Sequence, residues 1–338
     1  MAQDYSTFDL GEFELQSGAV VPGLQLAYKT YGALNSQGDN VVVLPTFYTG
    51  SHGRNEGFFG SGRAIDPDKH FIVSVNLFGN GISSSPSNMA SPYGGADFPT
   101  MTLYDNIRAQ HQLLAEYLNV NQIALVAGWS MAGCQSFQWG AQYPDFVKAI
   151  LPFCASAKTA EHNVVFLAGV KAALQADSGY ADGRYQSPPI KGLKAFGRIY
   201  AGWAFSQTFY RNEMFRLKGF DSAEALMLDW EQDHLDWDAN DLLCKLKTWQ
   251  LGDISANPLY NHDFKAALQA IKAKTIVIVC DNDLYFRPED NQIEIEHISN
   301  GELRIYESPW GHCVASPGNS PEFEVYLDRA ITELLGSG

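Results

Sequence analysis

Short apolar runs alternate with stretches of helical periodicity along most of the chain. The runs lie at 41–44, 71–75, 123–126, 149–153 and 275–279. Each is strand-sized and nearly free of polar residues, which is typical of strands buried on both faces of a sheet. Before the third run, Ile107, His111, Leu114 and Tyr117 recur at helical spacing. Strands that alternate with helices predict an α/β fold with a mostly parallel sheet and right-handed crossovers.

The two ends of the chain carry other patterns. Near the start, apolar residues alternate with polar ones on either side of two turn-forming pairs, at 17–18 and 22–23. The apolar positions are Phe13, Leu15, Leu24, Leu26 and Tyr28. This alternation predicts an antiparallel hairpin. Near the other end, 303–306 predicts a further strand, and 321–335 predicts a closing helix.

A long segment without strand-sized runs interrupts this order. From 155 to 262 the pattern is mostly helical, broken by prolines at 188–189 and 258. We therefore expect a discontinuous core, 1–154 and 263–338, with a helical lid inserted at 155–262. Aromatic residues recur there at helical spacing, namely Phe196, Tyr200, Trp203, Phe205 and Phe209. They are expected to form the core of the insertion rather than a substrate wall, although one helix can do both.

A candidate nucleophile follows the run at 123–126. The segment 128–133 reads Gly-Trp-Ser-Met-Ala-Gly, and a helical pattern begins directly after it. A nucleophile elbow needs this order of strand, sharp turn and helix, with small residues two before and two after the serine. Ala132 stands where glycine is usual. Ser130 is thus the candidate nucleophile, and the amide of Met131, at the helix start, is one candidate oxyanion donor.

A serine nucleophile needs a base and an acid that orients it, and both follow in the expected order. His312 lies in the loop after 303–306 and is the candidate base. The loop after 275–279 carries two aspartates. Asp283 is the preferred acid because the Leu-Tyr-Phe that follows could anchor the loop, while Asp281 is the alternative or a turn cap.

The second oxyanion donor is expected from the loop after the first parallel strand. That loop spans 45–51, and the backbone amide of Tyr48 is our candidate within it.

Composition narrows the function further. The 338 residues include 46% hydrophobic and 18% charged residues, with a net charge of −15. Such a surface disfavours nucleic-acid and membrane-surface partners. No apolar run approaches the roughly 20 residues of a membrane helix, and the first six residues show no secretory pattern, so a cytoplasmic location is expected.

Cysteine and motif usage argue against metals and cofactors. The five cysteines, Cys134, Cys154, Cys244, Cys280 and Cys313, are odd in number and form no Cys-x-x-Cys pair. Free thiols are therefore expected, without disulfides or zinc. No Walker loop, zinc-protease motif or complete dinucleotide fingerprint occurs, so we expect neither a metal nor a bound cofactor.

Several segments together resemble the homoserine O-acetyltransferase-like family of the α/β-hydrolase superfamily. They lie at 28–32, 49–51, 62–69, 128–133, 143–144, 283–286 and 310–312. The resemblance implies an α/β-hydrolase fold in which Ser130 is acylated by a donor such as acetyl-CoA. His312 would move the proton, Asp283 would orient His312, and a small alcohol would accept the acyl group. It also implies a homodimer formed through the insertion.

Two features depart from the family pattern. Where the family has an aspartate after the histidine, this chain has Cys313, and a neutral thiol cannot replace that charge. The family's acceptor-binding arginine would come from the insertion, where Arg198, Arg211 and Arg216 are available. The leading hypothesis is a serine-dependent O-acyltransferase without a cofactor. The alternatives are a carboxylesterase with water as acceptor and a non-catalytic binding protein.

Overall fold

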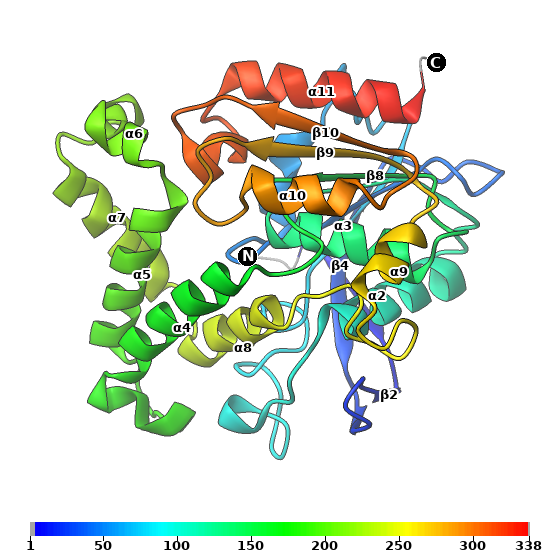
Figure 1. The fold of residues 1–338 in the computed structure, drawn as a ribbon. Helices are drawn as coiled ribbons and strands as arrows, with labels where there is room; N and C mark the ends of the chain where they lie inside the picture. Colours follow the sequence, from blue (N-terminus) through cyan, green and yellow to red (C-terminus); the bar gives the residue numbers. More distant parts are fainter. Residues whose placement is uncertain (1–3, 337–338) are drawn as a thin grey trace.

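The computed structural model describes residues 4–336 and centres on an eight-stranded sheet (Figure 1). The strand order is β1 (Ser6–Asp9), β4 (Gln25–Tyr31), β6 (Phe71–Val75), β5 (Val41–Pro45), β7 (Ile123–Trp129), β8 (Ala149–Phe153), β9 (Lys274–Cys280) and β10 (Gly301–Tyr306). Strands β6, β5, β7, β8, β9 and β10 pair in parallel, whereas β4 pairs antiparallel with both β1 and β6. The predicted α/β fold with a mostly parallel sheet is confirmed.

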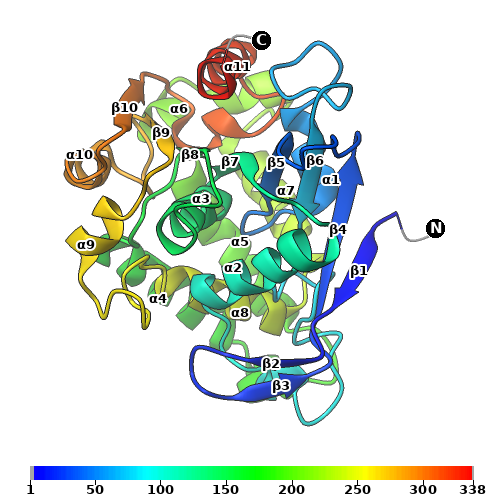
Figure 2. The same ribbon diagram turned by 90° about the vertical axis from the view of Figure 1, so that its right-hand side faces the viewer.

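Helices cover both faces of the sheet. Figure 2 shows α2 (Leu103–His111) and α3 (Met131–Gln142) on one face and α11 (Pro321–Leu335) on the other. Alternate side chains of each strand point to opposite faces. Val41 and Val43 thus join the hydrophobic cluster containing α2 and α3, while Val42 and Leu44 join the cluster containing α11. Burial on both faces explains why these strands read as continuous apolar runs.

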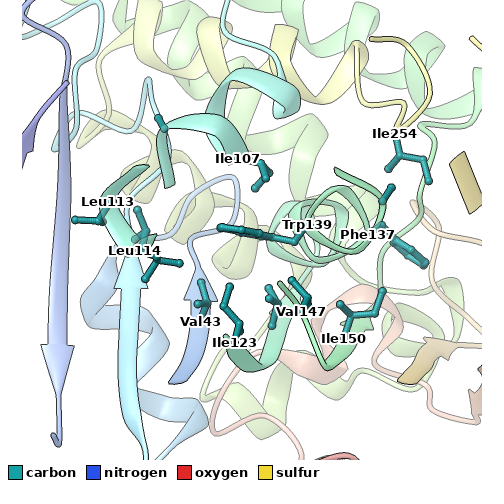
Figure 3. Close-up of a cluster of buried hydrophobic side chains, with 14 of the residues drawn as sticks. Val43, Ile107, Leu113, Leu114, Ile123, Phe137, Trp139, Val147, Ile150 and Ile254 are labelled. Atoms are coloured by element: carbon teal, nitrogen blue, oxygen red, sulfur yellow. The ribbon is translucent and has the colours of Figure 1, made fainter. Parts of the chain in front are cut away.

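The cluster beneath α3 contains its largest side chains. Trp139 and Phe137 of α3 lie against Ile123 and Ile150 of the sheet, with Ile107 of α2 beside them (Figure 3). All five are fully buried. Burying one such side chain contributes about 1.5–3 kcal/mol, so this face anchors the helix that follows Ser130.

The amino-terminal prediction is only partly right. A hairpin forms between β2 (Glu12–Glu14) and β3 (Val20–Pro22) as a separate two-stranded sheet. Leu26 and Tyr28 instead belong to β4, which pairs with β1 and β6 in the main sheet. The sharp turn at Gly23, where φ is +69°, separates the hairpin from β4.

Five α-helices lie within the insertion predicted at 155–262. They are α4 (Glu161–Gln175), α5 (Ile190–Ala204), α6 (Gln207–Arg211), α7 (Ala223–Leu235) and α8 (Ala239–Gln250). Figure 1 shows them beside the sheet rather than over either face, with α5 packed between α4 and α7. The Ser206 hydroxyl donates to the carbonyl of Pro309 and so ties this insertion to the segment before His312.

The other helices are short. They are α1 (His52–Asn55), α9 (Phe264–Gln269) and α10 (Pro288–Ile295), with 3-10 turns η1 (Glu56–Phe58), η2 (Gly95–Asp97), η4 (Ser178–Gly183), η5 (Met214–Lys218) and η6 (Gly311–Ala315). After α2 the chain continues as a π-helical turn, η3 (Gln112–Tyr117). No helix within 4–336 is both long and apolar enough to cross a membrane.

Candidate active site

Ser130 lies in the sharp turn between β7 and α3. Its backbone has φ +59° and ψ −129°, a conformation that non-glycine residues rarely adopt. A Cβ added to Gly128 would lie 2.4 Å from the Ala132 carbonyl carbon, and one added to Gly133 would lie 2.4 Å from the Ala155 Cβ. Both glycines are therefore needed for close packing, whereas position 132 accommodates a methyl group.

His312 and Asp283 form a buried hydrogen-bonded pair. The distance from His312 Nδ1 to Asp283 Oδ2 is 2.7 Å. The other carboxylate oxygen of Asp283 accepts from the backbone N–H groups of Tyr285, at 2.7 Å, and Phe286, at 3.1 Å. Because Asp283 is fully buried, these two amides fix its carboxylate toward the imidazole.

Asp281 is held elsewhere. Its Oδ1 accepts from the backbone N–H of Ser308 at 2.9 Å, and its Oδ2 accepts from the side chain of Asn282 at 2.9 Å. The bond from Ser308 joins the loop after β9 to the loop after β10. The geometry thus brings Asp283, and not Asp281, to His312.

Ser130 and His312 line the same cavity, which has a volume of about 180 Å³. Aromatic side chains form much of its wall, namely Phe47, Tyr48, Trp129, Tyr200, Phe205 and Trp230. Charged residues also line it, namely Arg54, Lys218, Asp229 and Asp233. The cavity therefore offers a ligand both apolar and charged surface beside the serine.

Two backbone amides, those of Met131 and Tyr48, are the candidate oxyanion donors. Met131 is the first residue of α3, where amide groups lack an intrahelical acceptor. Tyr48 lines the cavity from the loop after β5. Within the described chain, neither amide donates to a protein acceptor. The Tyr48 hydroxyl donates to the Leu242 carbonyl at 2.8 Å, which anchors this loop to α8.

The aromatic residues of the insertion serve both of the roles considered above. Phe196 and Phe209 are fully buried in its core. Tyr200 and Phe205 belong to the same hydrophobic cluster and also line the cavity. The insertion therefore packs on itself and supplies part of the cavity wall.

The candidate arginines of the insertion lie away from the cavity. Arg198 pairs with Glu224 and Glu231, and Arg216 pairs with Glu213. Neither these nor Arg211 line the cavity.

The cationic side chains that line the cavity are those of Arg54 and Lys218, and Cys313 lines it as well. Arg54 and Lys218 were not predicted from the sequence, because neither belongs to a motif that indicates ligand binding. Cys313 also lines the cavity, and burial raises the pKa of its thiol to about 12. This position is therefore uncharged, as its residue type predicted.

One cluster in the described chain has the spacing of metal ligands. Ligand atoms of Cys154, Asp283 and His312 lie within 4.8 Å of one another. Burial raises the pKa of the Cys154 thiol well above its usual value, whereas metals bind the thiolate. The direct bond between Asp283 and His312 also fits an acid–base pair better than a pair of metal ligands.

Comparison with known proteins agrees with this architecture. The family model for the alpha/beta hydrolase fold matches residues 39–317. An ethyl acetate hydrolase from Pseudomonas veronii is 33% identical, covering 98% of this chain and 96% of its own. A homoserine O-acetyltransferase from Trichormus variabilis is 31% identical, covering 89% and 86%. The solved structure of the acetyl esterase MekB superposes with a TM-score of 0.95 at 33% identity, covering 98% and 96%.

The chain belongs to the α/β-hydrolase family. Within that family it has both esterase and homoserine O-acetyltransferase relatives, which confirms the resemblance seen in the sequence. It is an enzyme of acyl transfer or ester hydrolysis.

Proposed function

We propose that this protein is a carboxylesterase that hydrolyses small acetyl esters through an acetyl-Ser130 intermediate. The observation that carries the proposal is the Asp283–His312 pair, 2.7 Å apart, at the cavity that also holds the strained Ser130. The triad of Ser130, His312 and Asp283 is a minimal set for nucleophilic catalysis with a base and an orienting acid.

The reaction proceeds in two steps, acylation of Ser130 and hydrolysis of the acetyl-serine. Ser130 Oγ attacks the ester carbonyl while His312 accepts the hydroxyl proton, and the amides of Tyr48 and Met131 stabilise the oxyanion. The intermediate collapses, and His312 returns the proton to the departing alcohol. Water then attacks the acetyl carbon and gives one proton to His312. The bond from that carbon to Ser130 Oγ breaks, His312 returns the proton to Ser130 Oγ, and acetate leaves. Asp283 holds His312 in the required tautomer throughout.

Cavity size and wall chemistry support a short acyl group. The cavity of about 180 Å³ holds a short acyl group, and its six aromatic side chains offer apolar surface for that group to pack against. The names of two similar proteins, an ethyl acetate hydrolase and an acetyl esterase, agree with this choice.

The second candidate is the O-acyltransferase that the sequence resemblance favoured, and a homoserine O-acetyltransferase at 31% identity supports it. The neutral Cys313 and the outward pairing of Arg198 and Arg216 weigh against an amino-acid acceptor.

A product assay separates the two candidates. Ethyl acetate, ethyl octanoate, and acetyl-CoA with and without L-homoserine are supplied in parallel. An esterase with a short-chain preference releases acetate from ethyl acetate at least about tenfold faster than it releases octanoate from ethyl octanoate. With an esterase, L-homoserine does not change the rate of CoA release from acetyl-CoA. O-acetylhomoserine as the main product would establish the transferase instead.

A further inference from the structure

A buried lysine lies next to the candidate active site without a bonding partner. Lys245 of α8 is 0% exposed, and its Nζ has no hydrogen-bond partner in the described structure. Burying an amine without a hydrogen bond costs several kcal/mol. A lysine in this position therefore calls for an explanation beyond packing.

Two aromatic rings enclose the Lys245 amine. Its Nζ lies 3.5 Å from the ring centroid of Trp237 and 5.3 Å from that of Tyr48. Both distances fall within the range of cation–π attraction, which is strongest away from water. The attraction exists only when the amine carries a charge.

Three residues on one face of α8 contact Tyr48. Leu242, Lys245 and Trp249 are three and then four residues apart, so they share a helix face. The Leu242 carbonyl accepts the Tyr48 hydroxyl, Lys245 faces the Tyr48 ring, and the Trp249 ring centroid lies 5.9 Å from it. Tyr48 in turn lines the cavity of Ser130, and its amide is a candidate oxyanion donor.

Several titratable groups face Lys245. On α8 these are Asp241 and Cys244, on α7 they are Asp233 and His234, and on the β5 loop it is Tyr48. Asp241 makes no hydrogen bond to the amine in the described structure, and its two oxygens accept from the Ser87 amide and hydroxyl. Burial lowers the pKa of Lys245 to about 7, with Asp241 opposing that shift. The charge of the amine therefore changes near neutral pH.

We propose that Lys245 is a positioning residue whose charged amine holds the Tyr48 ring, and with it the oxyanion-binding amide of the same residue. The inference rests on the proposed function, because it assigns Lys245 a role in the acyl-transfer step at Ser130. When the amine loses its charge, the loop relaxes. This lowers the stabilisation of the transition state more than it lowers the affinity for the substrate.

The test compares Lys245→Met with Lys247→Met, an exposed lysine on the same helix. Initial rates with para-nitrophenyl acetate are measured at pH 6 and pH 9. At pH 6 Lys245→Met lowers kcat by about tenfold with little change in KM. At pH 9, where the wild-type amine is neutral, the two kcat values converge. The ratio of the two kcat values removes any pH effect that both proteins share. Lys247→Met behaves as wild type.

A double-mutant cycle tests the route through Tyr48. Tyr48→Leu keeps the backbone amide but removes the ring, so adding Lys245→Met should cause no further loss of kcat. The cycle compares kcat for wild type, the two single variants and the double variant. Circular dichroism checks that each variant folds. A kcat ratio that is the same at both pH values, a loss confined to KM, or additive effects would overturn the role of Lys245.

Labelling keeps the two proposals separate. A fluorophosphonate probe should label Ser130 in the wild type and in Lys245→Met. If wild type labels but the pH-dependent loss is absent, only the role of Lys245 fails. If wild type does not label, the proposed function itself fails. If Lys245→Met does not fold, Lys245→Gln, which also removes the charge, must reproduce the loss of kcat at pH 6.

Discussion

The two aspartates of the β9 loop show how much a shift of two residues matters. Asp283 reaches His312 because the amides of Tyr285 and Phe286 hold its other oxygen. Asp281 instead accepts from the Ser308 amide. From the sequence both residues follow a buried strand, so position alone could not separate them. The Leu-Tyr-Phe segment that favoured Asp283 supplies the two amides that hold it.

Replacing each aspartate by asparagine tests this difference. Asp283→Asn is expected to lower kcat by about 10³–10⁴-fold, because an amide does not hold the required histidine tautomer. Asp281→Asn is expected to keep kcat within about threefold, since its bond is to a backbone amide far from the proton transfer. Steady-state ester hydrolysis gives both values, and a larger loss in Asp281→Asn would reverse the assignment.

At the scale of elements, burial on both faces made the parallel strands predictable. The runs at β5 to β9 contain almost nothing but apolar residues, and each of them forms a strand. β1 was missed because Ser6–Asp9 is largely exposed and carries no apolar alternation. The elbow was found because its glycines and flanking elements are all local in sequence.

Glycine substitutions in two helices test the packing of the elbow. Gly133→Ala in α3 would place a Cβ 2.4 Å from that of Ala155, whereas Gly169→Ala in α4 meets nothing within 4 Å. The first is expected to lower Tm and the rate of hydrolysis, because the backbone must shift beside Ser130. The second is expected to stabilise by up to about 1 kcal/mol. Thermal melts showing equal effects would contradict this packing.

Glu294 of α10 gives the fold a pH dependence. Its carboxylate accepts from the Ala157 amide at 2.8 Å and from the Asn291 side chain at 2.7 Å. Burial nevertheless raises its pKa from 4.5 to about 8. Between these values the folded state holds a proton that the unfolded state has lost, so the contribution of this group to stability falls as pH rises.

Glu294→Gln removes that dependence. The Tm of Glu294→Gln minus the Tm of wild type should increase from pH 5 to pH 8 and level off above it. Glu296→Gln, an exposed neighbour, is the matched control and should follow wild type. A difference that stays constant across this range would contradict the raised pKa of Glu294.

At the scale of the whole molecule, sheet order assembles the site. Ser130, Asp283 and His312 follow β7, β9 and β10, whose carboxyl ends share one edge of the sheet. This much could be predicted from strand order. Lys245 could not, because in the sequence it is one more lysine on an amphipathic helix. Only the packing of α8 against the β5 loop reveals that it is buried.

The low reactivity expected of the thiols depends on the fold of the whole molecule. All five cysteines are free, and burial raises the pKa of Cys134, Cys244 and Cys313 to about 12. In the native protein, reaction with a disulfide reagent such as DTNB should therefore be slow, at least about 100-fold slower than after unfolding in guanidinium. All five should react once unfolded. Rapid reaction of several thiols in the native state would contradict this burial.

The central claim is that Ser130 carries the acyl group, and intact-protein mass spectrometry tests it most directly. Wild type and Ser130→Ala are each mixed with para-nitrophenyl acetate and quenched in acid within the first turnovers. The intact mass of each protein is then measured. We expect one acetyl group on wild type, located on Ser130 by peptide mapping, and none on Ser130→Ala, which also loses hydrolysis. An acetyl group on another residue, or undiminished hydrolysis by Ser130→Ala, would contradict it.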